Sequence, residues 1–201
     1  MKKKSTSSKL TRKFKFIEEI DKLKLVERQT VICKGVRHEN SAEHSWHLAI
    51  MMMVFSDLAP KKMNLLKAIK MLLLHDLVEI DAGDTFAYDT TNMKTQDARE
   101  RKAAKRIFGI LPKKQAQEFH SLWLEFEATK SREAKFAKSM DRLQPILQNY
   151  QSGGHAWQKH GVKKSQVIAR NKKLIEASPE LWSHTKKVID LAVSKKFLRD
   201  D

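Results

Sequence analysis

Apolar residues recur along most of the chain at intervals of three and four positions, which is the period of an amphipathic α-helix. No stretch alternates apolar and polar residues in the way that a half-buried strand does. The pattern therefore predicts an all-α protein. The expected helices cover residues 10–26, 41–58, 64–81, 95–109, 113–129, 132–150, 164–176 and 179–196.

The same pattern predicts the domain organisation. Residues 1–9 are polar and basic, and we expect them to form a disordered tail. Residues 10–201 contain no internal repeat and suit a single helical domain. A domain of this size buries roughly 70% of its unfolded-chain surface, so it needs neither disulfides nor a structural metal to fold.

Polar residues mark several predicted helix ends. Asn40 precedes a helical pattern and Glu43 follows three residues later, which is an Asn-led capping box. Gly83 follows the predicted helix over 64–81, where a left-handed residue commonly ends a helix. Pro112 and Pro179 stand at helix starts, where a missing N–H costs nothing.

Composition narrows the cellular context. Cys33 is the single cysteine, so no internal disulfide can form, which fits a reducing compartment. The longest apolar run, Leu48 to Phe55, is far shorter than the ~20 residues that span a bilayer. The basic start has no apolar segment behind it and does not resemble a signal peptide. We expect a soluble, cytoplasmic protein without a membrane partner.

The charge balance points to anionic partners in general. Forty Lys and Arg residues against 24 Asp and Glu residues give a net charge of +16, and such a field attracts phosphate esters, nucleic acids and membrane surfaces alike. The Lys/Arg doublets are scattered along the chain rather than gathered in one stripe. A solvated basic surface is therefore favoured over a nucleic-acid interface.

The segment from Met71 to Ile80 is the first with candidate chemistry. It is apolar nearly all round, which predicts a buried helix, yet it contains His75, Asp76 and Glu79. At 100° per residue these three side chains share one sector of the helix. Buried ionisable groups need a metal, mutual pairing or a wet cavity. A satisfied ion-pair network is the alternative to a functional site here.

Two more candidate residues lie elsewhere in the chain. His44 falls in the first turn of the helix that begins after Asn40, and Asp141 lies beside the apolar face of its own helix. Each also has an ordinary structural explanation. His44 is then a histidine whose hydrogen bonds are satisfied by the surrounding protein, and Asp141 forms an ion pair with Lys138. Taken with His75 and Asp76, they form a mixed nitrogen and oxygen set that suits a divalent ion such as Mn, Co, Fe or Zn. Such an ion makes bound water a nucleophile near neutral pH.

The pattern His44 … His75-Asp76 … Asp141 resembles the H…HD…D signature of the HD phosphohydrolase superfamily. The segments 40–48, 75–86 and 135–150 are similar to the branch that includes bacterial 5′-deoxynucleotidases, and the resemblance covers roughly residues 14 to 195. It implies a single-domain HD-type helical bundle, a homodimer and one divalent ion, which could be Mn, Co, Fe, Zn or Mg.

The resemblance also implies roles for individual residues. The metal ligands would be His44, His75, Asp76 and Asp141. Glu79 matches the catalytic carboxylate of the family and Asp84 a second carboxylate near the attacking water. Arg28 matches an arginine that binds the substrate phosphate. The implied reaction is phosphomonoester hydrolysis of a nucleoside 5′-monophosphate by metal-activated water.

The sequence departs from the family pattern next to Arg28. In the characterised deoxynucleotidases a tryptophan that contributes to sugar selectivity follows this arginine, whereas here Gln29 and Thr30 follow it. The departure puts the preference for 2′-deoxyribose in doubt. Phe86 and Tyr88, close after Asp84, are candidates for stacking on a base.

Three alternative functions remain open. One is a phosphodiesterase or pyrophosphohydrolase of the same superfamily. Another is a two-metal phosphodiesterase or di-iron oxygenase, but such sites use extra histidines, and His120 is the single histidine between Asp76 and Asp141. The third is a basic nucleic-acid-binding protein with an inactive site. It is disfavoured because no zinc-finger spacing or helix-turn-helix signature stands out.

Overall fold

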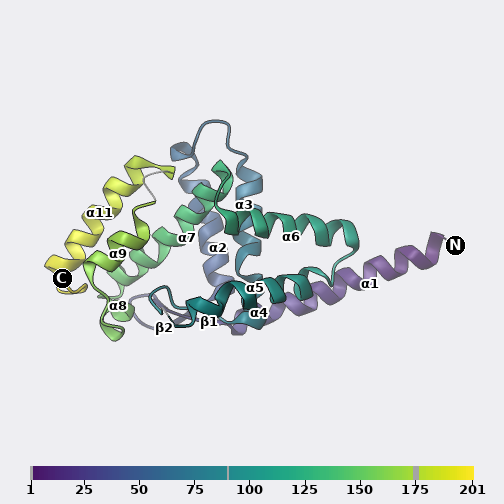
Figure 1. The fold of residues 1–201 in the computed structure, drawn as a ribbon, viewed down its shortest axis with the longest axis horizontal. Coiled ribbons are helices and arrows are strands. Elements are labelled where there is room, and N and C mark those ends of the chain that lie inside the picture. The colour runs from purple at the N-terminus through teal and green to yellow at the C-terminus, as the bar shows by residue number, and fades with distance from the viewer. Residues whose placement is uncertain (1, 90, 174–176) are drawn as a thin grey trace.

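The computed structural model describes residues 2–89, 91–173 and 177–201, and Figure 1 shows their arrangement. The longer helices are α1 (Lys2–Ile20), α2 (Ser41–Val54), α3 (Leu65–Leu74), α5 (Met93–Phe108), α6 (Lys113–Ala128), α7 (Arg132–Gln151), α9 (Lys164–Asn171) and α11 (Pro179–Ser194). Two short α-helices, α4 (Glu79–Ala82) and α8 (His155–Lys159), and the 3₁₀ helices η1 (Asp21–Leu25), η2 (Ser56–Leu58) and η3 (His75–Val78) join them.

Helices α2, α3 and α7 form the middle of the molecule, and α5 and α6 pack beside them (Figure 1). The main core lies between these helices and includes the fully buried Leu48, Leu72, Phe126 and Phe136. A smaller apolar cluster around Trp157 joins α7 to the C-terminal helices α9 and α11. The all-α prediction is confirmed. The boundaries of α6, α7 and α11 lie within two residues of the predicted ones, whereas α9 ends at Asn171, before the predicted end at residue 176.

A two-stranded antiparallel sheet is the main difference from the predicted fold. Strands β1 (Glu27–Ile32) and β2 (Arg37–Asn40) pair in a hairpin whose turn includes Gly35 at φ +100°. The alternation that would have revealed it is missing because two of its three buried positions are polar: Thr30 and Glu39 are buried beside Val31. The prediction that this segment contains no strand was wrong.

The first helix also differs from the expectation. Helix α1 starts at Lys2, within the predicted tail, and continues without a break through the expected boundary at residue 9. Residues 2–20 contain neither Gly nor Pro, so nothing local ends the helix there. In Figure 1 this helix extends away from the body of the molecule toward the N-terminus. The division into a tail and a domain stays a prediction.

The predicted helix over 64–81 changes geometry part-way. Regular α-helix ends at Leu74, η3 covers His75–Val78, and α4 resumes at Glu79. A 3₁₀ segment turns about 120° per residue rather than 100°, so the side-chain angles expected from an ideal α-helix do not apply here. Short 3₁₀ stretches inside helices often mark functional positions. The end of the predicted helix over 164–176 lies outside the described residues.

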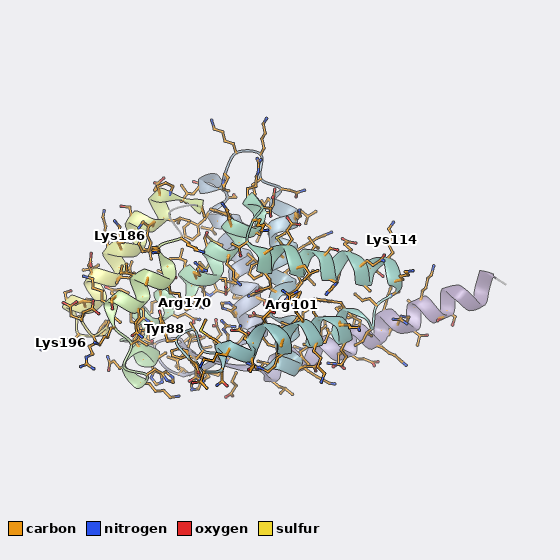
Figure 2. The ribbon with its side chains drawn as sticks, viewed as in Figure 1. Tyr88, Arg101, Lys114, Arg170, Lys186 and Lys196 are labelled. Carbon is orange, nitrogen blue, oxygen red and sulfur yellow. The ribbon has the colours of Figure 1, made fainter. Side chains whose placement is uncertain are left out.

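The basic residues are spread over the surface, as their distribution along the chain indicated. Figure 2 shows Arg101, Lys114, Lys186 and Lys196 on well-separated parts of the molecule, and all four are exposed. Across the described ranges, every helix falls short of the length and apolar character that crossing a membrane requires.

Candidate metal centre

Separate elements bring His44, His75 and Asp141 together. His44 lies in the first turn of α2, His75 begins η3, and Asp141 lies in the middle of α7. The potential ligand atoms of these three residues all lie within 4.8 Å of one another. His44 Nε2 is 3.2 Å and His75 Nε2 is 3.7 Å from Asp141 Oδ1. Two imidazole nitrogens thus face one carboxylate oxygen in the protein interior.

Hydrogen bonds to the Nδ1 atoms of His44 and His75 hold both rings so that their Nε2 atoms face Asp141 Oδ1. His75 Nδ1 lies 2.7 Å from the carbonyl oxygen of Leu72, and because a carbonyl only accepts, Nδ1 must be the donor. His44 Nδ1 lies 3.1 Å from Gln144 Oε1, which is likewise an acceptor. His75 Nε2 is buried and lies 2.9 Å from Asp76 Oδ1 and 3.7 Å from Asp141 Oδ1. Such outer partners are typical of metal-binding histidines.

Asp76, the fourth predicted ligand, lies beside the cluster but outside its 4.8 Å group. Its Oδ1 is 2.9 Å from His75 Nε2, and its Oδ2 is 4.0 Å from His44 Nε2. Asp76 Oδ2 also accepts a hydrogen bond of 2.9 Å from Arg28 Nη1. The structure therefore gathers His44, His75 and Asp141 most tightly, with Asp76 adjacent.

Arg28 projects from β1 into a group of carboxylates. Besides Asp76, its Nη1 lies 3.4 Å from Asp84 Oδ1 and 3.7 Å from Glu79 Oε2. Burial acts to lower the pKa of Arg28, but the charges of Asp76, Asp84 and Glu79 outweigh it and raise that pKa further. The guanidinium is a fixed positive charge, and its Nε is buried without a hydrogen-bond partner among the described residues. A guanidinium next to a metal cluster suits a phosphate group.

The ionisable groups of the site have strongly shifted pKa values. Burial acts to lower the pKa of His75, but Asp76 and Asp141 raise it to about 10. Burial acts to raise the pKa of Asp76, but His75 and Arg28 lower it to about 2. The pKa of Asp141 is held well below its usual range, because hydrogen bonds to His44 and His75 outweigh burial.

The pKa values of Glu79 and Asp84 are raised, in contrast to those of Asp76 and Asp141. Burial and the neighbouring charge of Asp76 raise the pKa of Glu79 well above its ordinary value, despite the opposing charge of Arg28. Burial also raises the pKa of Asp84. Ser41 Oγ donates a hydrogen bond of 2.6 Å to Glu79 Oε2 and fixes this carboxyl group. Carboxyl groups with opposite pKa shifts in one site are characteristic of acid–base chemistry.

Sequence reasoning missed three residues that support the site. Glu39, at the end of β2, is 1% exposed and lies 3.5 Å from His44 Nδ1. Gln144, one turn after Asp141 on α7, contacts both His44 and Glu39. Ser41 opens α2 and holds Glu79. The sequence signal for Glu39 was weak, since a charged residue directly before a capping box is usually exposed.

A cavity of about 250 Å³ opens onto the site. Arg28, His75, Asp76, Glu79, Asp84 and Asp141 contribute to its wall. Aromatic and basic side chains also line it, namely Phe86, Tyr88, Trp157, Arg142 and Arg170. Figure 2 labels Arg170 and Tyr88 close together, and Arg170 Nη1 donates to the carbonyl oxygen of Ala87 at 3.2 Å. The cavity thus combines acidic, aromatic and basic walls.

Gln29 lies at the rim of this cavity and is held in place. Its Oε1 lies 3.1 Å from His160 Nε2 and 3.3 Å from Lys159 Nζ. The ring of His160 packs against Phe86 with a centroid distance of 4.2 Å and a tilt of 34°. The residue that follows Arg28 is therefore the polar Gln29, and it contacts His160, which packs on Phe86.

The residues present fit a divalent metal ion. Histidine nitrogens and carboxylate oxygens converge from different elements, and outer hydrogen bonds orient both rings. A mixed set of this kind suits transition metals and leaves coordination positions open. His44, His75 and Asp141, with Asp76 beside them, are the residues that would hold the ion.

Comparison with known proteins places this geometry in a family. The family model described as "HD domain" matches residues 20–182. This chain belongs to the HD domain family. His44, His75, Asp76 and Asp141 all lie within the matched range, and their role as the signature ligands stays a prediction.

Individual relatives agree with this assignment. The human protein 5′-deoxynucleotidase HDDC2 is 33% identical over 134 residues, which are 66% of this chain and 64% of the human protein. The mouse protein of the same name is 33% identical over 67% of this chain and 66% of its own length. The matched region thus spans slightly less than two thirds of these curated relatives.

A solved structure is similar over nearly the whole chain. The crystal structure of a predicted metal-dependent phosphohydrolase from Magnetospirillum magnetotacticum MS-1 has 42% sequence identity and a TM-score of 0.92, and the match covers 96% of each chain. The helical fold and the approach of α2, η3 and α7 are therefore those of an HD-domain protein.

Proposed function

We propose that this HD-domain protein is a metal-dependent phosphohydrolase that removes the phosphate from nucleoside 5′-monophosphates. The observation that carries the proposal is the group of His44, His75 and Asp141 within 4.8 Å. His75 and Asp141 also line a cavity together with Arg28 and Glu79. The relatives named 5′-deoxynucleotidase and metal-dependent phosphohydrolase support the same reaction class.

The mechanism assigns one task to each part of the site. A divalent ion, when bound, supplies Lewis-acid activation of water near neutral pH. Arg28 binds the phosphate and places the phosphorus near the cluster, and the basic wall adds positive charge on the other side. Water attacks the phosphorus while Glu79 takes up a proton from it. The bond from phosphorus to the nucleoside oxygen breaks, and Glu79 returns the proton to that leaving oxygen. Asp84, 3.4 Å from Arg28, orients Arg28 and the attacking water.

Purified protein tested against a matrix of metals and phosphorylated compounds checks the proposal directly. We expect hydrolysis of nucleoside monophosphates with at least one of Mn²⁺, Co²⁺, Fe²⁺, Zn²⁺ or Mg²⁺, and little turnover of diphosphates or cyclic nucleotides. Preference for a pyrophosphate or a diester would instead support the alternative enzymes of the superfamily. No hydrolysis with any metal, together with salt-sensitive binding of RNA or DNA, would support the nucleic-acid-binding alternative.

The position of Gln29 leads to a prediction about sugar selectivity. A tryptophan at this position contributes to deoxyribose selectivity in related enzymes, whereas Gln29 is polar and is held by His160 and Lys159. We expect comparable kcat/KM values for matched ribo- and deoxyribonucleoside monophosphates. Steady-state kinetics on AMP with dAMP, and on UMP with dUMP, measure this. A strong preference for deoxyribose would show that another residue discriminates.

Two further properties remain predictions. A cytoplasmic location rests on the single cysteine and the lack of a long apolar segment in the sequence. A homodimer rests on the family resemblance alone.

A further inference from the structure

Glu39 is a buried carboxylate that no ligand or catalytic role has used. It is 1% exposed and lies at the point where β2 leads into α2. Gln144 Nε2 and Gln148 Nε2 donate hydrogen bonds to its Oε1, at 2.6 Å and 2.7 Å. Thr30 Oγ1 donates to its Oε2 at 3.0 Å. Its surroundings connect the hairpin, α2 and α7, which are the elements that carry Arg28, His44 and Asp141.

Within the part of the chain that the structure describes, the polar partners of Glu39 are donors or cations. In addition to these hydrogen bonds, His44 Nδ1 lies 3.5 Å and Arg28 Nε lies 3.7 Å from Glu39 Oε2. A carboxylate accepts at both oxygens, whereas an amide of the same shape accepts at one atom and donates at the other. The pocket around Glu39 is therefore matched to a carboxylate rather than to any uncharged side chain of its size.

The carboxylate determines which way the Gln144 amide points. Because Glu39 can only accept, the NH₂ group of Gln144 must face it. The amide oxygen of Gln144 then faces His44 Nδ1, at 3.1 Å. An oxygen there requires a proton on Nδ1, and a neutral imidazole with that proton has its lone pair on Nε2. Nε2 is the atom that points toward Asp141 and the metal cluster.

We propose that Glu39 is a positioning residue that, through the Gln144 amide, fixes the His44 tautomer whose Nε2 is free to bind a divalent metal ion. The inference rests on the proposed metal site. With a glutamine at position 39, the Gln144 amide can turn over and present its NH₂ group to His44 Nδ1. That arrangement favours the opposite tautomer, whose Nε2 carries a proton and cannot bind a metal. Outer partners of this kind typically change metal affinity by about 10–100-fold.

Gln144 and Gln148 provide a matched pair for the test. Both donate to the same oxygen of Glu39 from one face of α7, but Gln144 alone of the two also contacts His44. We expect Glu39→Gln and Gln144→Met to weaken Mn²⁺ binding by about 10–100-fold, while Gln148→Met stays within a few-fold of the wild-type chain. Calorimetric titration of the full chain with Mn²⁺ alone measures the affinity. The visible absorption spectrum of the Co²⁺-loaded protein should change in the same two variants only.

The outcomes separate this inference from the proposed function. If Gln144→Met and Gln148→Met weaken Mn²⁺ binding equally, Glu39 supports packing only and the inference is overturned. Wild-type affinity in a folded Glu39→Gln protein would also overturn it, while leaving the metal site intact. A wild-type chain that binds no divalent ion would overturn both the metal site and the inference. Should Glu39→Gln fail to fold, the comparison of the two glutamine variants still decides.

Discussion

Replacing Glu79 with alanine is expected to lower turnover by about 10²–10⁴-fold, the usual contribution of general acid–base catalysis. Glu79 is 7% exposed and is held by Ser41 at one oxygen, which also lies 3.7 Å from Arg28. It is not a member of the group formed by His44, His75 and Asp141. The variant should therefore still bind a metal ion and a nucleoside monophosphate.

Elemental analysis, substrate binding by calorimetry and steady-state kinetics together measure this separation. Glu19→Ala is a control outside the site, because the Glu19 side chain is 14% exposed and pairs with Arg106 and Lys22 rather than with Arg28. Thermal unfolding must be compared first, since removing one member of a buried polar cluster can itself destabilise the protein. A folded Glu79→Ala protein that lost its metal, or kept near-normal turnover, would contradict the assigned role.

Replacing His75 with alanine is expected to abolish both metal binding and activity. His75 Nε2 is a buried nitrogen of the cluster, and its ring is held by Leu72 and packs against Phe126 with a centroid distance of 4.9 Å. No neighbouring nitrogen can replace it, because His44 is already committed to the same centre. Activity should fall to the background rate at any metal concentration that saturates the wild-type protein.

The matched control for this variant is His120→Ala. His120 is the single histidine between Asp76 and Asp141, and its ring stacks on Trp123 away from the cluster, with centroids 6.1 Å apart. The control should keep its metal content and its turnover. Loss of one of two bound ions in His120→Ala would instead indicate the two-metal alternative. Metal content per chain, measured before and after dialysis, distinguishes these results.

Several features of the protein could be predicted from local sequence. The helices follow from apolar periodicity, and their starts follow from short-range hydrogen bonds such as the capping box between Asn40 and Glu43, which the structure contains. The three ionisable residues between Met71 and Ile80 predicted a buried polar site, because burying ionisable groups without partners is costly. The ligand types were thus readable before their positions were known.

The hairpin could not be predicted, because its inward residues serve the site instead of the core. Arg28 and Thr30 on β1, and Glu39 on β2, break the alternation that predicts strands, and contacts from distant helices compensate for their burial. The 3₁₀ geometry of His75–Val78 was likewise hidden, since the local sequence favours a continuous α-helix.

By itself, the sequence determined the helical elements and the kinds of side chain available for chemistry, because both depend on neighbours within about one helical turn. The tertiary structure alone decided which of those side chains meet. His44 and Asp141 are 97 positions apart, and Glu39 and Gln144 are 105 apart, yet each pair is in contact. The direction of the Gln144 amide, and with it the free nitrogen of His44, follows from donors and acceptors that only packing of the hairpin, α2 and α7 brings together.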